Sequence, residues 1–497
     1  MPDWELNLDV EPAGDAPLFL RIARAISEDV RRGRLRPGDE LPGSRTLARS
    51  LSVHRNTVLA AYRELEAEGW ISSTQAKGTF VSRALPDPSP RPFARAAPPR
   101  AFIPEEPGFE LPEVLPTSEP ARAPPGALWL GGGVPDVRLV PVAALSRAYR
   151  RALKRHVRAA LDYADPRGQG RLREALAAMV SQVRGLAAAP DNVLVTRGSQ
   201  MALYLLARTL VTPGDAVAVE ALGYRPAWDA LRQARAKLVP LAVDGEGLDV
   251  DALEKLSRTR RLRAVYVTPH HQYPTTRVLS AARRLRLLEL ARTRRFAVIE
   301  DDYDHEFHYD GRPVLPLASA DRHGVVVYVG TLSKLLAPGL RIGFAVAPRA
   351  LIERLAGVRA VVDRQGDQAV ELAVAELLED GEVQRHARRA KRAYEARRDA
   401  MAEALKKHVG DALEFELPSG GMALWTRTAE GIDPDAWVAR GKERGVYAFA
   451  GSWFTFDGKP TPNVRLGFAA LAEPELREAV KRLAAARPEV RRRRASG

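Results

Sequence analysis

Prolines are concentrated in one stretch of this chain, and this concentration divides the sequence into parts that must fold separately. Thirteen of the 37 prolines lie at residues 84–127, where apolar runs are short. Proline has a fixed φ angle and no backbone N–H, so this stretch can form neither a long helix nor a central strand. We expect a linker there, able to reach on the order of 100 Å when extended. The expected divisions are a first domain at 1–83, the linker at 84–127, a large domain at 128–490 and a basic tail at 491–497.

The first 83 residues have the pattern of a small helical domain with a β-hairpin. Apolar residues recur at helical spacing from Leu18 to Arg32, after Ser44 and after His54. Two strand-like runs follow near residues 70–82, with Gly78 at the turn. This order predicts a winged helix-turn-helix, which places the start of its second helix in the DNA major groove. A small protein-interaction domain with an ordinary polar surface remains the alternative.

Three segments of this part, PGDELPGSRTLARSL, VHRNTVLAAYRELEAEGW and KGTFV, resemble the DNA-binding domain of the GntR family. The resemblance implies that double-stranded DNA is a partner. Gly43 replaces a usual serine, His54 stands where a serine commonly caps the recognition helix, and Gln75-Ala76 differs from the usual wing. These departures bear on base preference and wing contacts. The residues expected to contact DNA are Arg45, Arg55, Asn56, Thr57, Gly78 and, at the wing tip, Lys77.

Charge adds little to the DNA-binding hypothesis. Residues 16–83 carry twelve basic and seven acidic side chains, a net charge of +5, but most of the chain's +14 lies beyond residue 127.

The absence of cysteine excludes disulfides, thiolate metal sites and cysteine nucleophiles. The sequence contains no apolar run near the ~20 residues of a membrane span, and its start lacks the features of a signal peptide. We therefore expect a cytoplasmic protein.

The large domain alternates helical and strand-like runs, which predicts an α/β fold with a mainly parallel sheet. One strand, Val325 to Val329, ends at Gly330 and is followed by Lys334, one of only 11 lysines. A lysine amine in this place can form a Schiff base with a carbonyl cofactor, while nearby hydroxyls and a guanidinium hold an anionic group. These neighbours are Thr331, Ser333 and Arg341. The alternative is a surface lysine on a strand–helix loop.

The stretch TLSKLLAPGLRIGF resembles the lysine motif of fold-type I aminotransferases that use pyridoxal 5′-phosphate. LDYADPRGQG, NVLVTRGSQM, VAVEALGYRPAW, FAVIEDDYD and PNVRLGFA match other motifs of that family in the same order. The resemblance implies that Lys334 forms the internal aldimine, Asp301 bonds the pyridine nitrogen and Arg465 takes a substrate carboxylate. Tyr303 would bond the phenolic oxygen, and Tyr224 would stack on the ring. The phosphate would contact Ser199, Gln200, Thr331, Ser333, Arg341 and, from a partner subunit, Tyr163.

One segment departs from the aminotransferase pattern. The enzymes usually have Asn-Pro-Thr-Gly where this chain has Tyr273-Pro274-Thr275-Thr276, so the asparagine that bonds the phenolic oxygen is missing. An aromatic residue at this place is typical of the regulator branch of the family. The departure argues against efficient transamination.

The segment after Asp301 also permits a metal interpretation. Five possible ligands are close together: Asp302, Asp304, His305, Glu306 and His308. Because no ligand spacing stands out, we expect no metal site and expect His305 and His308 at the surface or behind the cofactor-binding residues.

The order of winged helix, proline-rich linker and aminotransferase-like domain resembles the MocR subfamily of GntR transcriptional regulators. The resemblance implies a homodimer that carries pyridoxal phosphate as part of a sensor. We expect a DNA-binding regulator whose effector is pyridoxal phosphate, an amino compound, or both. Lys334, Asp301 and Arg465 keep open a working aminotransferase with an accessory DNA-binding domain. A third possibility is a regulator whose aminotransferase-like site holds no cofactor.

Overall fold

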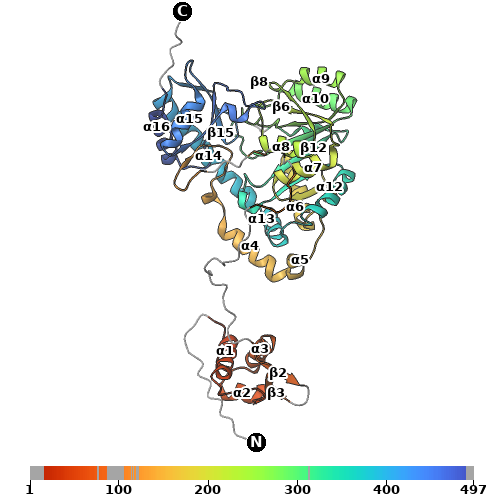
Figure 1. Ribbon diagram of the computed structural model, residues 1–497, viewed down its shortest axis with the longest axis vertical. Coiled ribbons are helices and arrows are strands. Elements are labelled where there is room, and N and C mark those ends of the chain that lie inside the picture. Colours follow the sequence, from red (N-terminus) through yellow and green to blue (C-terminus); the bar gives the residue numbers. More distant parts are fainter. Residues whose placement is uncertain are drawn as a thin grey trace, which may run out of the picture. The chain divides into compact units, whose positions relative to one another are not determined.

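The structure is a computed structural model that describes residues 16–74, 78–86, 106–112, 115, 117–118, 123–311 and 314–488 (Figure 1). Contacts divide the chain into two units, Met1–Pro112 and Glu113–Gly497, and the boundary falls within the expected linker. Lys77, most of 84–127 and the tail at 491–497 lie outside the described residues, so the expected domain limits stay predictions. Within the described part of the chain, no helix is long and apolar enough to cross a bilayer.

The first unit is a winged helix-turn-helix, as the sequence predicts. Its elements are α1 (Leu18–Arg31), β1 (Glu40–Leu41), α2 (Ser44–Ser50), α3 (Arg55–Ala67), β2 (Ile71–Thr74) and β3 (Gly78–Val81). β3 lies between β1 and β2 and is antiparallel to both. The three helices bury apolar side chains at helical spacing, among them Ile22, Ile26, Leu47, Val58 and Leu65. This small core fixes the start of α3 at the surface.

The second unit is built on a seven-stranded sheet of order β5-β13-β12-β11-β10-β6-β7. β13 is antiparallel to both neighbours and the other pairs are parallel, so the expected mainly parallel sheet is confirmed. The seven strands are β5 (Val193–Thr196), β6 (Ala216–Glu220), β7 (Lys237–Leu241), β10 (Leu262–Val267), β11 (Ala297–Asp302), β12 (Val326–Thr331) and β13 (Gly343–Val346).

Helices cover both faces of this sheet because its strands carry apolar side chains on each face. In β6, for example, Val217 and Val219 pack with one helical layer, and Ala216 and Ala218 pack with the other. The helices of this part are α4 (Val142–Arg155), α5 (Val157–Leu161), α6 (Gly170–Arg184), α7 (Ser199–Leu210), α8 (Arg225–Gln233), α9 (Val250–Thr259), α10 (Ala281–Arg294), α11 (Leu317–Ala320), α12 (Arg349–Val362) and α13 (Gln368–Glu379).

The C-terminal part of this unit forms a smaller antiparallel sheet of order β14-β15-β18-β17, visible in blue with its helices in Figure 1. Its elements are α14 (Glu382–Val409), β14 (Leu413–Phe415), β15 (Ala423–Thr428), α15 (Pro434–Glu443), β17 (Phe449–Ala450), β18 (Asn463–Gly467) and α16 (Glu473–Ala485). Two short pairs complete the topology, β4 (Leu128–Trp129) with β16 (Val446–Tyr447) and β8 (Val243–Asp244) with β9 (Gly247–Leu248). The β4–β16 pair ties the start of the unit to its C-terminal part.

Candidate functional site

A cavity of about 900 Å³ lies at the carboxyl ends of β6, β10, β11 and β12. Open α/β sheets place ligand sites at this edge, because successive loops converge there. The cavity brings together nine of the residues that the sequence singled out: Ser199, Gln200, Tyr224, Asp301, Tyr303, Thr331, Ser333, Lys334 and Arg341. Residues far apart in the sequence therefore share one pocket.

Asp301 lies near the carboxyl end of β11 and is a buried hydrogen-bond acceptor. Tyr266, on the neighbouring strand β10, donates its hydroxyl to Oδ2 of Asp301 over 2.8 Å. Oδ1 is buried and has no hydrogen-bond partner among the described residues. Burial raises the pKa of Asp301 to about 7, and the nearby Asp302 contributes in the same direction. The free oxygen suits a protonated ring nitrogen, which would supply the missing donor.

Lys334 lies in the loop after β12, with its amine facing the cavity. Burial and the Arg465 guanidinium lower the pKa of Lys334 to about 8. A larger share of its amines is therefore neutral at physiological pH than in an exposed lysine, as a nucleophile requires. The loop is ordered by Thr331, whose Oγ1 accepts a bond from the Ser333 backbone N–H over 3.1 Å.

Arg341 packs against the N-terminus of α7 and forms one side of an anion cradle with it. It adopts a left-handed backbone conformation with φ of 53°, and its Nη2 donates to the Arg197 carbonyl over 2.8 Å. A Cβ at Gly198 would lie 2.8 Å from the same nitrogen, so only glycine permits this approach. The free N–H groups of a helix start and a guanidinium together favour a phosphate.

Arg465, on β18, lies behind the glycine run at residues 131–133, which our sequence analysis did not single out. Its side chain is 1% exposed, and Nη1 donates to the Gly131 carbonyl over 3.4 Å. A Cβ at Gly132 would overlap Nη1, so a side chain there would displace the guanidinium. The guanidinium also lies 4.6 Å from the centre of the Tyr273 ring. Arg465 itself does not line the cavity, whereas Gly131, Gly132 and Gly133 do.

Aromatic residues form one wall of the cavity. Tyr273 makes edge-to-face contacts with Tyr224 and Tyr303, with ring centres 5.6 and 6.0 Å apart. The Tyr303 hydroxyl donates to the His271 carbonyl over 3.0 Å. The residue that replaces the usual asparagine thus belongs to the pocket wall.

Tyr163 does not line the cavity of its own chain. It is 76% exposed, and the Arg364 guanidinium lies 4.3 Å from its ring centre. Its expected contact with a partner subunit's cofactor stays a prediction.

The described residues expected to contact DNA lie at the start of α2, in the first turn of α3 and at the start of β3. Arg45, Arg55 and Asn56 are exposed, and Arg55 Nε donates to Ser44 Oγ over 3.3 Å. His54 caps α3, because its Nδ1 accepts a bond from the Asn56 backbone N–H over 3.2 Å. The absent serine therefore does not leave the helix without a side-chain cap.

Thr57 is partly exposed in the first turn of α3, and Gly78 is exposed at the start of β3 with φ of 114°. A Cβ on Gly78 would lie 2.8 Å from the Glu40 carboxylate. The wing therefore favours glycine here because of its positive φ, whereas the exposed Glu40 side chain is free to move aside. Lys77, the remaining expected contact, lies outside the described residues.

His305 and His308, expected either at the surface or behind the cofactor-binding residues, are both buried. His305 is 3% exposed and His308 is 7% exposed, so neither is a surface residue. His305 Nδ1 lies 3.0 Å from Asp302 Oδ2, and Asp302 also accepts a bond from the Tyr328 hydroxyl over 2.8 Å. The fold buries these polar groups directly behind the cavity wall that contains Asp301.

Sequence reasoning missed Tyr266 and the glycines at 131–133. The run LGGGVPD carries a local signal, since three successive glycines permit a close backbone approach. Tyr266 carries none, because its sequence context is that of any buried strand residue.

Comparisons with known proteins agree with this geometry. Residues 18–81 match the model of the bacterial regulatory proteins of the gntR family, and residues 126–483 match aminotransferase class I and II. The α-aminoadipate aminotransferase LysN from Thermus thermophilus, solved with N-(5′-phosphopyridoxyl)-L-leucine, superposes with a TM-score of 0.68 at 30% identity. The match covers 73% of this chain and 92% of that enzyme. Fold and site thus define a GntR-type DNA-binding domain joined to a fold-type I aminotransferase domain.

Full-length relatives have the same two-part organisation. The probable rhizopine catabolism regulatory protein MocR of Rhizobium meliloti is 31% identical over 482 residues, covering 95% of this chain and 94% of that protein. The transcriptional regulator TauR of Rhodobacter capsulatus is 32% identical, with 96% and 97% covered. The chain belongs to the MocR-type GntR regulators. An aromatic-amino-acid aminotransferase of Thermococcus litoralis is 34% identical, but over 71% of this chain and 86% of that enzyme.

Proposed function

We propose that this regulator binds pyridoxal 5′-phosphate at Lys334 and senses the cofactor, an amino compound, or both. The observation that carries the proposal is the pairing of Lys334 with Asp301 in one cavity. Asp301 offers a buried oxygen that lacks a donor among the described residues, and the Lys334 amine has a pKa lowered to about 8 by burial and Arg465. These are the two groups that a pyridinium nitrogen and an aldehyde need.

The other residues of the cavity fit the remaining parts of the cofactor. The N-terminus of α7, with Ser199 and Gln200, and the Arg341 guanidinium would hold the phosphate. Ser333 Oγ is buried without a partner among the described residues and would add a donor. Tyr224 would cover a face of the ring. When bound, pyridoxal phosphate supplies an aldehyde that bonds amines reversibly and a ring that accepts electrons.

An amino compound that carries a carboxylate suits the glycine run and Arg465. The guanidinium is held at 3.4 Å from the Gly131 carbonyl, and its Nε has no partner among the described residues. A carboxylate could accept two parallel bonds from such a group. Binding that occurs only in one arrangement of the C-terminal part would shift the protein toward that arrangement.

A homodimer follows from the same proposal. Tyr163 is exposed and lies outside its own cavity, which leaves it free to approach the phosphate of a partner subunit. Two winged helices in one dimer would bind paired half-sites on DNA. Ligand binding to the aminotransferase-like domain would then change DNA binding at both half-sites.

Regulation is favoured over turnover by Tyr273, which lies in the pocket wall where the enzymes usually have asparagine. The alternative, an active aminotransferase with an accessory DNA-binding domain, is supported by the presence of Lys334, Asp301 and Arg465. The relation to enzymes such as the Thermococcus litoralis aminotransferase also supports it.

The test is to footprint the full-length protein on the DNA upstream of its own gene, with and without pyridoxal phosphate and candidate amino acids. Cofactor-dependent protection, lost in Lys334→Ala and kept in the exposed-lysine control Lys237→Ala, supports the proposal. Borohydride reduction followed by peptide mapping should place the cofactor on Lys334. Steady transfer of amino groups to a keto acid, without any change in DNA protection, would favour the enzyme instead.

A further inference from the structure

Three histidines meet behind the aromatic wall of the large cavity. His270 and His271 follow β10, and His308 follows β11, 37 positions after His271 by their numbers. One ring nitrogen from each can be chosen so that all three lie within 4.8 Å of one another. The three residues are 2%, 1% and 7% exposed. Such a convergence of buried imidazoles requires polar partners.

These imidazoles have free nitrogens. Both ring nitrogens of His270, Nε2 of His271 and Nδ1 of His308 are buried and lack a hydrogen-bond partner among the described residues. A buried polar atom without a partner is unfavourable, so an occupant that satisfies several of these nitrogens at once is favoured. Each neutral imidazole has one nitrogen with a lone pair, so an occupant that accepts a lone pair from each ring would satisfy one nitrogen of every histidine in the trio.

His271 is held in the orientation that a metal ligand needs. Its Nδ1 lies 2.8 Å from Oδ1 of Asp304, and both side chains are buried. Where the Asp304 carboxylate accepts this hydrogen bond, Nδ1 carries the proton and Nε2 presents its lone pair. A carboxylate behind the other ring nitrogen is the usual support of a histidine that binds a metal, because it fixes the tautomer and the ring orientation.

We propose that His270, His271 and His308 bind a divalent transition-metal ion of the zinc type, with Asp304 orienting His271. Three imidazoles and one open position are a typical zinc arrangement, with Zn–N distances of about 2.0–2.1 Å. Tetrahedral ligation at that distance separates the nitrogens by about 3.4 Å, so the donors must approach by on the order of 1 Å. Imidazole suits zinc, nickel and copper, whereas magnesium and calcium prefer oxygen.

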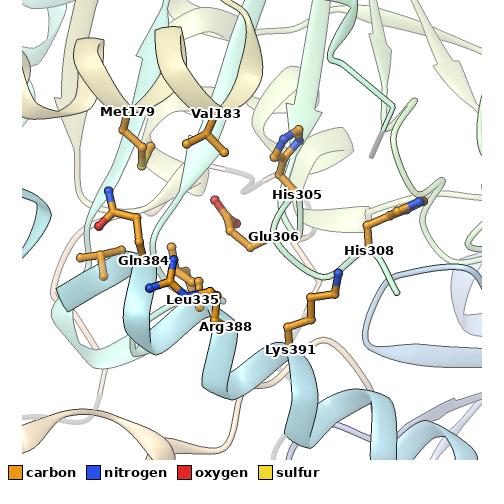
Figure 2. Close-up of a pocket in the computed structure, with 11 residues that line it drawn as sticks. Met179, Val183, His305, Glu306, His308, Leu335, Gln384, Arg388 and Lys391 are labelled. Atoms are coloured by element: carbon orange, nitrogen blue, oxygen red, sulfur yellow. The ribbon is translucent and has the colours of Figure 1, made fainter. Parts of the chain in front are cut away.

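A second, smaller cavity gives His308 room to move and opens a route to the site. It has a volume of about 240 Å³ and lies between α6, α14 and the loop after β11. His305 and His308 are on one side of it, with Lys391 next to His308, as Figure 2 shows. The cavity can hold a water molecule for the open position. The positive charge of Lys391 disfavours a cation at this place, and the nearby buried Asp304 carboxylate offsets that repulsion.

His305 is outside the proposed ligand set although its ring stacks on His270 at 4.8 Å between centres. Its Nδ1 contacts Asp302, and His305 does not belong to the group of histidines whose ring nitrogens lie within 4.8 Å of one another. The proposed set shares only His308 with the five possible ligands read from the sequence. No spacing in the sequence pointed to His270 or His271.

A bound metal would stiffen the wall of the cofactor cavity. The His271 carbonyl accepts the Tyr303 hydroxyl at 3.0 Å, and Tyr273 follows His271 by two residues. The ion would therefore join the loop after β10 to the loop after β11, both of which contribute tyrosines to that wall. Binding only to the folded state would also raise the thermal midpoint in proportion to the logarithm of zinc concentration.

The experiment uses the full-length protein without a purification tag. After dialysis against a chelator, zinc is titrated by calorimetry and bound metal is counted by mass spectrometry. The expected result is one zinc per chain. Affinity should fall about 10–100-fold in Asp304→Asn and further in His270→Gln and His308→Gln. His386→Gln, which removes a buried histidine of α14 outside the trio, should bind zinc as wild type does.

A second measurement does not depend on variants that could fail to fold. Cobalt added to the wild-type protein should give the visible bands of a site with nitrogen ligands, and zinc should displace it. X-ray absorption of the zinc form should show imidazole scattering. The proposal is overturned if wild-type protein takes up no stoichiometric zinc, if its zinc lacks imidazole ligands, or if His308→Gln binds it unchanged; water would then occupy the trio.

Discussion

Tyr266 and Asp301 are joined across neighbouring parallel strands by a 2.8 Å hydrogen bond that leaves Oδ1 of Asp301 as the free acceptor among the described residues. The strand register explains the pair. Tyr266 lies beside Ile299, and Asp301 is two residues further along β11 on the same face. The hydroxyl therefore orients the carboxylate, so that one oxygen is available to a ligand in the cavity.

We predict that Tyr266→Phe weakens the binding of pyridoxal phosphate about tenfold, because one hydrogen bond to a charged group contributes ~1.5 kcal/mol or more. The variant keeps the ring in the core and removes only the donor. An absorbance titration of cofactor-free protein measures the effect. Tyr204→Phe is the matched control, since Tyr204 lines the same cavity and makes no side-chain hydrogen bond within the described residues. Equal affinities in the two variants would show that the Tyr266 hydroxyl has no role.

The pKa of Lys334 predicts a specific pH dependence. Burial and the Arg465 guanidinium lower this pKa from 10.5 to about 8, so the neutral amine becomes the major form above pH 8 instead of above 10.5. Covalent capture of pyridoxal phosphate by cofactor-free protein should accelerate about tenfold per pH unit below 8 and level off above it. Stopped-flow absorbance measures the capture rate across pH 6–10, which extends about two units on each side of the Lys334 pKa.

The Arg465→Met variant tests the electrostatic part of that shift. Loss of the nearby positive charge should raise the pKa of Lys334 and move the midpoint of the capture rate to higher pH. Arg225→Met, at an arginine that lines the cavity, should leave the midpoint in place. A midpoint near 10.5 in the wild type would contradict the assigned environment of Lys334.

Arg184 is predicted to be a main support of the fold behind the site. It is 1% exposed, forms an ion pair with Glu306, and donates to the Tyr328 hydroxyl, which in turn donates to Asp302. Arg184→Met should lower the free energy of unfolding by ~3–5 kcal/mol, because it leaves a largely buried carboxylate unpaired.

Arg171→Met is the control for this change, because Arg171 lies on the same helix as Arg184. It breaks the more exposed ion pair with Glu379 of α13 and should lower the free energy of unfolding by only ~0–1 kcal/mol. Urea unfolding of both variants gives the comparison. Similar losses in the two would mean that the Arg184–Glu306 pair is as weak as a surface pair.

Arg55 at the start of α3 is predicted to contact DNA. Arg55→Ala should weaken operator binding by ~1–3 kcal/mol and relax specificity if the contact is to a base, or reduce the salt slope by about one if it is to a phosphate. Arg63→Ala, exposed on the same helix but about two turns further from its start, should have little effect. Fluorescence anisotropy at several salt concentrations separates these outcomes. If only the Arg63 variant loses affinity, the groove-facing end of α3 is wrongly assigned.

The amino-acid sequence by itself determined the two-part organisation and nine of the residues that line the cavity. Hydrophobic periodicity is local, so it indicated the helices of the winged helix and the strands that precede the site residues Asp301 and Lys334. The resemblance to fold-type I aminotransferases then placed the residues that follow these strands in one cofactor site. Of the two positions expected for His305 and His308, the structure shows the one behind the cavity wall and not the surface position. The sequence could not choose between them, because the polarity of a segment does not reveal which other segments pack over it.

Only the tertiary structure decided which distant side chains meet. The bond from Tyr266 to Asp301 depends on the order and register of β10 and β11, and the approach of Arg465 to Gly132 depends on how β18 packs against the start of the unit. The meeting of His270, His271 and His308 has the same origin, since two loops converge behind one sheet edge. Each of these distances is set by packing between segments, and no spacing within a single segment encodes it.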